Sequence, residues 1–285
     1  MQPNPLFTTL QQYGGIATRA QLIGHGIPAR EIGDAVRAGS IHRVRRAHYA
    51  TAQADPRGLV AVRVGGRLTA GSATRTYGLW GGSTVPVHVR LPSNAARLRP
   101  PHAQGRVRLH WVDGRLAREC WRDDPEESLL GAARWEPDET AIAILDTAVG
   151  RGVTTIPHLT RLFADESPRL RRLVQGVRLG SESGIESLAR QRLEKAGHEV
   201  EQQVLVPGVG RVDMRVDGGL LVEFDGYETH GSREAFERDR VRDSSTRLQG
   251  LPIVRFSARQ VLQQWPTVAR TIARIAAEPA GMGAP

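Results

Sequence analysis

Three carboxylates, Asp213, Glu223 and Asp225, lie near the end of the sequence in two short stretches that alternate apolar and polar residues. Such alternation predicts β-strands, and the intervening Asp217-Gly218-Gly219 predicts a tight turn. If the turn is centred on its first glycine, Asp213 faces Glu223 across the hairpin. Asp225 shares their face because side chains repeat every two residues along a strand. The spacing therefore brings three acidic side chains together.

Like charges directly opposite each other destabilise a sheet, so the three carboxylates call for a cation. Oxygen ligands without a cysteine cluster favour Mg²⁺, with Mn²⁺ as a substitute and Ca²⁺ also compatible. Beside a basic surface, such a metal suggests phosphodiester hydrolysis, with the metal generating the hydroxide and neutralising charge at phosphorus. The alternative is a solvated acidic face on an edge hairpin.

Further residues around the hairpin are candidates for the same site. His230 follows the second strand and suits a general acid or base, although a lone histidine can also be structural. Glu186 starts a helix three residues after Ser183, which predicts a capping box as the simplest interpretation. Downstream, arginines on a helix capped by Ser232 suit phosphate contacts, with i,i+4 ion pairs as the alternative. These are Arg238, Arg240 and Arg242.

The charge distribution indicates what kind of partner the protein binds. The 285 residues carry a net charge of +9, and Lys195 is the only lysine. Residues 1–118 hold 17 arginines against four acidic residues, whereas the remainder is slightly acidic. A basic protein most often binds nucleic acid, so we expect DNA as the partner. The alternative is that the arginine content reflects genome base composition.

Several classes of function are excluded. A lone Cys120 allows neither an internal disulfide nor a cysteine-rich zinc site. No apolar run reaches the roughly 18–20 residues of a membrane helix. The sequence contains no P-loop motif, so we expect no nucleotide cofactor. No secretory signal is evident, so we expect a cytoplasmic, nucleoid-associated protein. The oligomeric state, monomer or homodimer, stays open.

The first 50 residues predict a winged helix-turn-helix. Apolar spacing at Leu6–Leu10, an N-cap at Thr18 and an early Pro28 predict three helices, and Ile41–Ala50 predicts a basic strand pair. A second short helix would enter a major groove and the basic wing would contact phosphates. A winged helix used only for protein contacts is the alternative. The arginines placed for DNA are Arg19, Arg30, Arg37, Arg43, Arg45 and Arg46.

The whole chain predicts an α/β (α+β) architecture in several parts. Alternation over Val85–Leu91 predicts a strand with one polar side, and Ser257 is expected to cap one final helix that reaches Ile275. The expected parts are a winged helix-turn-helix (1–55), a basic mixed α/β region (56–120), a helical bridge (121–180), a nuclease-like domain (181–278) and a flexible tail (279–285).

Two family resemblances refine these expectations. Gly14–Leu22 and Ile41–Ala50 resemble the N-terminal domain of AbiEi-type antitoxins of type IV toxin–antitoxin systems, which implies DNA binding. Residues 180–275 resemble the PD-(D/E)XK nuclease fold, in its Vsr-like endonuclease branch. The motifs are Ser183-Gly-Ile-Glu186-Ser187, Arg211-Val-Asp213, Val222-Glu223-Phe-Asp225-Gly226, His230 and Phe236–Asp243.

The nuclease resemblance implies a metal-dependent DNA endonuclease, for repair or defence, in which Glu186, Asp213 and Glu223 surround the metal. One departure matters, because the family's usual lysine is Asp225 here and Lys195 lies elsewhere. His230 or Arg240 would have to replace it. The alternative is a DNA-binding transcriptional regulator or antitoxin with a catalytically degenerate nuclease-like domain, and a third is a protein-interaction module.

Overall fold

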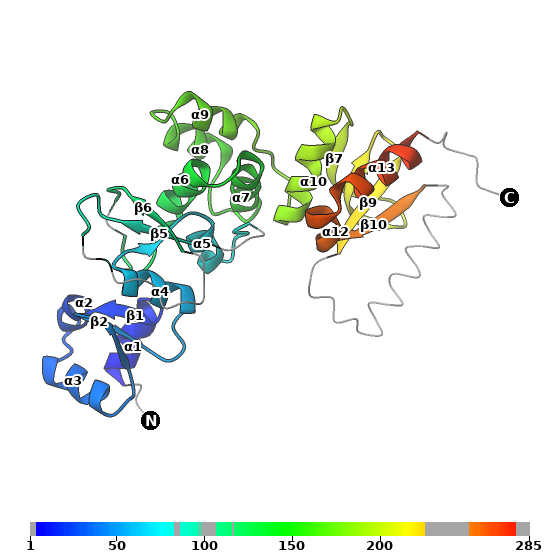
Figure 1. Cartoon of the computed structure of the whole chain (residues 1–285). Helices are drawn as coiled ribbons and strands as arrows, with labels where there is room; N and C mark the ends of the chain where they lie inside the picture. The colour runs from blue at the N-terminus through cyan, green and yellow to red at the C-terminus, as the bar shows by residue number, and fades with distance from the viewer. Residues whose placement is uncertain are drawn as a thin grey trace. The chain divides into compact units, whose positions relative to one another are not determined.

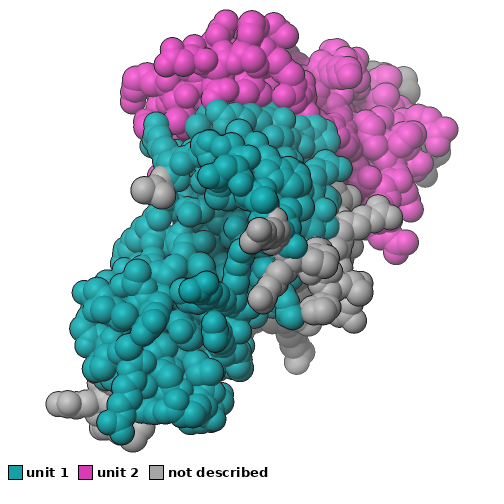
Figure 2. Space-filling view, turned by 60° about the vertical axis from the view of Figure 1, so that its left-hand side comes forward, with its two compact units in different colours: residues 1–137 teal, residues 138–285 magenta. Residues whose placement is uncertain are grey.

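The computed structural model describes residues 4–82, 86–96, 98, 107–115, 117–225 and 251–277. These form two compact units, residues 1–137 and 138–285 (Figure 2). The division falls within the segment expected to be a helical bridge. Each unit contains helices and small sheets, as the expected mixed α/β class requires.

Residues 4–51 of unit 1 form three short helices and a three-stranded sheet (Figure 1). The elements are α1 (Pro5–Gln12), β1 (Ile16–Thr18), α2 (Arg19–Gly24), α3 (Ala29–Arg37), β2 (His42–Arg45) and β3 (His48–Ala50). The strands are antiparallel in the order β1-β3-β2. Buried apolar side chains from all three helices pack together, which confirms the predicted helix-turn-helix with a basic strand pair.

Local sequence signals fix the entry to the helix-turn-helix. Thr18 accepts a hydrogen bond from the backbone N–H of Gln21, and the Gln21 side chain accepts one from the backbone N–H of Thr18. This capping box satisfies donors that the first turn of a helix leaves unpaired. The N-cap predicted at Thr18 is therefore confirmed.

The rest of unit 1 is a second small α/β layer. Its elements are α4 (Pro56–Val64), β4 (Arg67–Leu68), α5 (Ala70–Thr74), the 3₁₀ helix η1 (Arg75–Tyr77), β5 (Val87–Leu91), β6 (Val107–Trp111) and α6 (Pro125–Trp135). Strand β5 lies between β4, which is antiparallel to it, and β6, which is parallel.

The strand predicted over Val85–Leu91 is confirmed as β5, and all five of its residues are buried, those of the polar side included. Its two polar side chains have partners inside the protein. Arg90 donates from Nε to both carboxylate oxygens of Asp123, at 3.1 and 2.9 Å. The His88 ring lies against His110, with 3.1 Å between their ring nitrogens. Partners from other segments therefore allow a central strand to carry charged and polar residues.

Unit 2 begins with four helices. They are α7 (Asp138–Gly150), α8 (Ile156–Leu162), α9 (Pro168–Gln175) and α10 (Gly184–Lys195). Helices α7 and α10 pack together around a buried ion pair between Asp146 and Arg190, whose N and O atoms are 2.9 Å apart. Asp146 also accepts hydrogen bonds from the Ser187 hydroxyl and the backbone N–H of Arg178. These contacts satisfy a fully buried carboxylate.

The remainder of unit 2 is a four-stranded sheet with flanking helices. Its elements are β7 (Val200–Val206), β8 (Gly210–Val216), β9 (Leu220–Asp225), β10 (Ile253–Ser257), α12 (Ala258–Gln263) and α13 (Trp265–Ala276). The order is β10-β9-β8-β7, with β7, β8 and β9 antiparallel in sequence and β10 parallel to β9. Helix α10 contacts β7 and α12, and α13 contacts β9.

One expectation in this region needs correction. The single final helix is two helices, because Pro266 stands in the first turn of α13. Proline provides no N–H for the hydrogen-bond ladder of a continuing helix and its ring clashes with the preceding turn, so α12 ends before it. In the first turn of a new helix that N–H is not needed. The N-cap predicted at Ser257 is confirmed, and it forms a full capping box with Gln260.

Candidate nucleic-acid interface and polar row

The basic residues predicted to meet DNA fall into two groups on the winged helix. Five of the six are exposed: Arg19, Arg30, Arg37, Arg43 and Arg46. We call these five the basic surface. They come from the start of α2, both ends of α3, and strand β2 with the turn that follows it.

Helix α3 has one apolar and one charged side. Ile32 is buried in the core, with Ala35 and Val36 packed against that core. On the other side Arg30 and Arg37 both pair with Asp34, and the side chains of the two arginines are 91 and 72 % exposed. Surface pairs of this kind contribute little, about 0–1 kcal/mol. The two guanidinium groups are therefore available to a stronger anion.

The sixth predicted residue, Arg45, lies differently from its neighbours. It is half-buried, and its guanidinium is so close to Gly65 that a Cβ on that glycine would fall 1.9 Å from Nη1. A side chain in this position faces a cavity within unit 1. The phosphate contact predicted for Arg45 stays a prediction, because the structure describes no DNA.

The arrangement of three helices followed by an antiparallel basic strand pair can now be compared with known proteins. Residues 4–51 match the family described as transcriptional regulator, AbiEi antitoxin. The resemblance inferred from Gly14–Leu22 and Ile41–Ala50 is thereby confirmed for this part of the chain. No curated protein matches the chain. We refer to residues 4–51 as the AbiEi-like domain. No described helix of the whole chain is long and apolar enough to cross a membrane.

The candidate residues of unit 2 lie on neighbouring strands of its sheet. The β8–β9 hairpin pairs Met214 with Val222 and Val216 with Leu220, which is the register predicted from the turn. The next position along brings Asp213 opposite Glu223. The structure therefore confirms the register on which the acidic pair was predicted.

A row of four polar side chains crosses this sheet. Gln203 on β7 lies between the positions that pair with Met214 and Val212, and so beside Asp213 on β8. Glu223 on β9 pairs with Arg255 on β10. We call Gln203, Asp213, Glu223 and Arg255 the polar row. Hydrogen bonds link its members in two pairs, because Gln203 bonds to Asp213 and Glu223 accepts from Arg255 Nε at 2.7 Å.

Glu186 approaches the row from the start of α10. Its Oε2 accepts hydrogen bonds from the backbone N–H of Glu182 at 2.9 Å and from Gln203 Nε2 at 3.0 Å. Ser183 caps the helix by accepting from the Glu186 N–H, so only half of the expected capping box forms. The carboxylate turns toward the sheet instead, because Gln203 offers it a second donor there.

The surroundings of Glu186 and Asp213 disfavour their charged forms. Burial raises the pKa of Glu186, and the neighbouring charge of Asp213 raises it further. The pKa of Asp213 is also raised, first by burial and then by the charges of Glu223 and Glu182, against a lowering by the N–H of Phe224. The two acids therefore repel each other and are partly desolvated, and both effects disfavour their charged forms.

The predicted metal ligands are brought together only in part. Asp225 lies at the end of β9 with an exposed side chain, while Glu223 is occupied by Arg255. Within the described residues, no group of three or more His, Cys, Asp or Glu side chains is placed to hold a metal ion. The metal site stays a prediction. His230, Arg238, Arg240 and Arg242 lie outside the described residues.

Two members of the polar row were missed from sequence. Gln203 lies in β7, a strand that was not predicted, and its backbone has φ of +53°. Arg255 was not predicted as a site residue. Its signal was a single cation inside the apolar run Ile253–Phe256, which is unusual unless a neighbouring strand supplies an acid.

Proposed function

We propose that the protein is a DNA-binding transcriptional regulator of the AbiEi antitoxin type, which contacts DNA through residues 4–51. The match of this segment to a family of transcriptional regulators carries the proposal. The basic surface supports it, because exposed arginines on α2, α3 and β2 are suited to the phosphates on either side of a groove. Specific reading of bases would come from α3, the second helix of the helix-turn-helix, in place of the shorter α2 that was predicted from the sequence to enter the groove.

Binding-site selection from random duplex DNA tests this function. The full chain is expected to enrich one sequence class, with an affinity that falls steeply as salt rises, because arginine–phosphate contacts release counterions. Footprinting of the selected site should protect one face of the duplex. The proposed regulator function would be refuted if no sequence is enriched and the DNA affinity does not depend on salt concentration.

For unit 2 we propose a nuclease-like domain of the PD-(D/E)XK type that has lost its metal site. The strand order, with an antiparallel β7-β8-β9 and a parallel β10, supports that relationship, as does the acidic start of α10. The described residues do not fit a divalent metal as they are arranged, because Arg255 engages Glu223 and no three acidic or histidine side chains converge there. Asp225 in place of the expected lysine also removes a cation that the reaction would use.

An active endonuclease is the second candidate. The raised pKa values of Glu186 and Asp213 favour it, because a bound Mg²⁺ or Mn²⁺ would relieve their mutual repulsion. In that case Glu186, Asp213 and Glu223 would hold the ion, and the ion would supply the activated water.

One assay separates the two candidates. The full chain is incubated with supercoiled, nicked, linear and mismatched DNA in Mg²⁺, Mn²⁺ or EDTA. The degenerate domain predicts no metal-dependent cleavage and no rise of Tm with either metal. Cleavage that disappears in Asp213→Ala, while DNA binding persists, would establish the endonuclease instead.

A further inference from the structure

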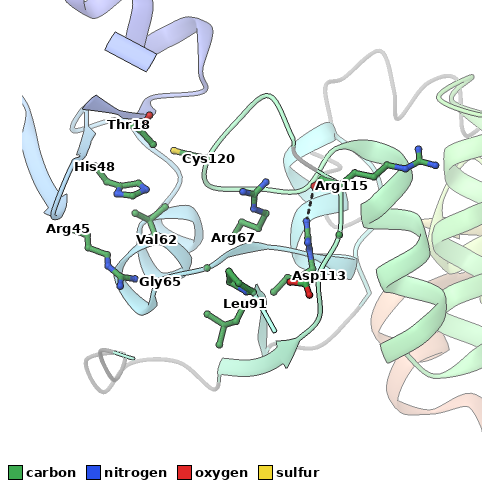
Figure 3. Close-up of a pocket in the computed structure, with 14 residues that line it drawn as sticks. Thr18, Arg45, His48, Val62, Gly65, Arg67, Leu91, Asp113, Arg115 and Cys120 are labelled. Atoms are coloured by element: carbon green, nitrogen blue, oxygen red, sulfur yellow. Dashed lines mark hydrogen bonds between the residues drawn. The ribbon is translucent and has the colours of Figure 1, made fainter. Parts of the chain in front are cut away.

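A cavity of about 400 Å³ lies within unit 1 (Figure 3). Thr18, Arg45 and His48 line it from the three strands of the AbiEi-like domain, and Arg67 and Leu91 line it from β4 and β5. Figure 3 shows Arg45 and His48 at one side of the space. Its volume is within the range of pockets that hold small ligands.

The lining is basic, with four arginines and the single acid Asp113. Two of the arginines already have acidic partners. Arg90 bonds to the fully buried Asp123, and Arg115 Nη1 lies 2.7 Å from a carboxylate oxygen of Glu126. These pairs hold the wall in place. The charge available to a ligand is that of the two arginines that remain.

Arg45 and Arg67 supply the available charge. Arg45 forms no hydrogen bond or ion pair with the described residues. Arg67 reaches Asp123 only through Nε, at 4.0 Å, and its Nη1 is buried with no hydrogen-bond partner in the described part of the chain. A buried donor without a partner costs about 1–3 kcal/mol. An anion that accepted a hydrogen bond from Nη1 would remove that cost.

The rest of the cavity is suited to the body of a ligand. Val62, Leu91 and Pro92 provide apolar contacts. Asp113 provides acceptor oxygens, and hydrogen bonds from Ser93 lower its pKa, so it is charged at neutral pH. A charged acceptor suits hydroxyl groups. The lining therefore combines an anion site, an apolar wall and a hydroxyl acceptor.

We propose that this cavity binds a small organic phosphate of mononucleotide size, with the phosphate held by Arg45 and Arg67. A DNA backbone phosphate offers the same chemistry, and the experiment below distinguishes it. Because Arg45 and His48 belong to the strand pair of the winged helix, occupancy changes DNA affinity, and DNA changes ligand affinity equally. This coupling rests on the proposed regulator function, whereas ligand binding itself does not.

Cys120 provides a direct measurement. It lines the cavity and is the only cysteine of the chain. Burial raises its pKa to about 11, so alkylation by iodoacetamide is slow and easily followed by intact mass. At saturating 5′-AMP we expect the rate of Cys120 alkylation in the full chain to fall roughly 3-fold or more. Adenosine, which lacks the phosphate, leaves the rate unchanged at the same concentration, and inorganic phosphate protects less than 5′-AMP.

Matched variants test the two arginines. Arg67→Gln is expected to abolish protection by 5′-AMP, whereas Arg63→Gln, the same change at an exposed residue of α4 outside the cavity, keeps it. Arg45→Gln also abolishes protection, and it removes no hydrogen bond or ion pair with the described residues, only packing against Gly65. It therefore decides the question if Arg67→Gln does not fold, which circular dichroism shows.

The proposal is overturned if 5′-AMP protects no better than adenosine or inorganic phosphate, or if both folded variants keep full protection. It is also overturned if only duplex DNA protects the wild-type protein. In that last case the cavity is a contact for the DNA backbone. Because 5′-AMP protection is measured without DNA, its failure would leave the regulator function untouched.

Discussion

The basic surface of unit 1 and the polar row of unit 2 use charge in opposite ways. The arginines of the basic surface are exposed, and on α3 they pair with a single shared acid. The carboxylates of the row are partly buried, and each accepts a hydrogen bond from the protein itself. Exposed charge is available to a large hydrated polyanion, whereas engaged charge mainly holds strands and a helix start in position. Four experiments test this contrast.

The largest effect is expected from the interior charge of unit 2. Asp146→Ala removes the fully buried partner of Arg190, which keeps the half-exposed Glu194 as its acidic partner, and it leaves the Ser187 hydroxyl without its acceptor. The expected cost is about 3–5 kcal/mol. A thermal melt of the full chain, monitored by circular dichroism, should show a much lower Tm for the part of the signal that comes from unit 2. Four of the five tryptophans lie in unit 1, so the fluorescence melt should move less. The exposed Asp165→Ala serves as the control, and an equal effect there would refute a structural role.

The next largest effect concerns the basic surface. Arg43→Gln with Arg46→Gln should weaken DNA affinity on the order of 10- to 100-fold and reduce the salt slope by about two. Fluorescence anisotropy over a salt series measures both. The control pair Arg161→Gln with Arg259→Gln removes the same charge from exposed positions of unit 2. If the control weakens binding equally, net charge rather than the winged helix determines affinity.

The pH response should differ between the units. Burial lowers the pKa of both His88 and His110 to about 4, below the ordinary value of 6.5. The two neutral histidines therefore contribute fully to the free energy of unfolding above pH 6.5. This contribution is lost as pH falls toward 4, because the unfolded chain takes up protons before the folded one. We expect unit 1 to lose on the order of 2 kcal/mol in this window, measured by tryptophan fluorescence.

A variant checks the source of that pH effect. His110→Phe keeps a ring against Trp135, where the two rings stack with centroids 4.0 Å apart, but removes the titrating group. The stability that unit 1 loses between pH 6.5 and 4 should then be smaller than in the wild-type protein. An unchanged pH profile would show that other groups control it.

The smallest effect is expected at Asp213. Its pKa is raised, so the folded state prefers the protonated form and the carboxylate is penalised at neutral pH. Asp213→Asn should stabilise the protein at pH 7 by roughly 0.5 kcal/mol, with the difference fading as pH falls toward the ordinary value of 3.8. Asp165→Asn should change nothing. A destabilised Asn variant at pH 7 would show that the charge itself holds the sheet.

Features that depend on adjacent residues could be predicted from the sequence. The capping box at Thr18 and the register that opposes Asp213 to Glu223 both follow from a few consecutive side chains. Features that depend on distant segments could not. The burial of Arg90 is one example, because no residue near it in sequence indicates Asp123 as its partner. The engagement of Glu223 by Arg255 likewise depends on how β10 joins the sheet.

The backbone contacts of the acids have a consequence for reading related sequences. Glu186 accepts the N–H of Glu182, and Asp213 Oδ2 accepts the N–H of Phe224 at 2.8 Å. Both acids would thus be retained by selection for folding alone, long after any hydrolytic activity had gone. An intact acidic motif is therefore weak evidence that such a domain cuts DNA. The residue at position 255 is more informative, because a neutral side chain there would remove the guanidinium that pairs with Glu223.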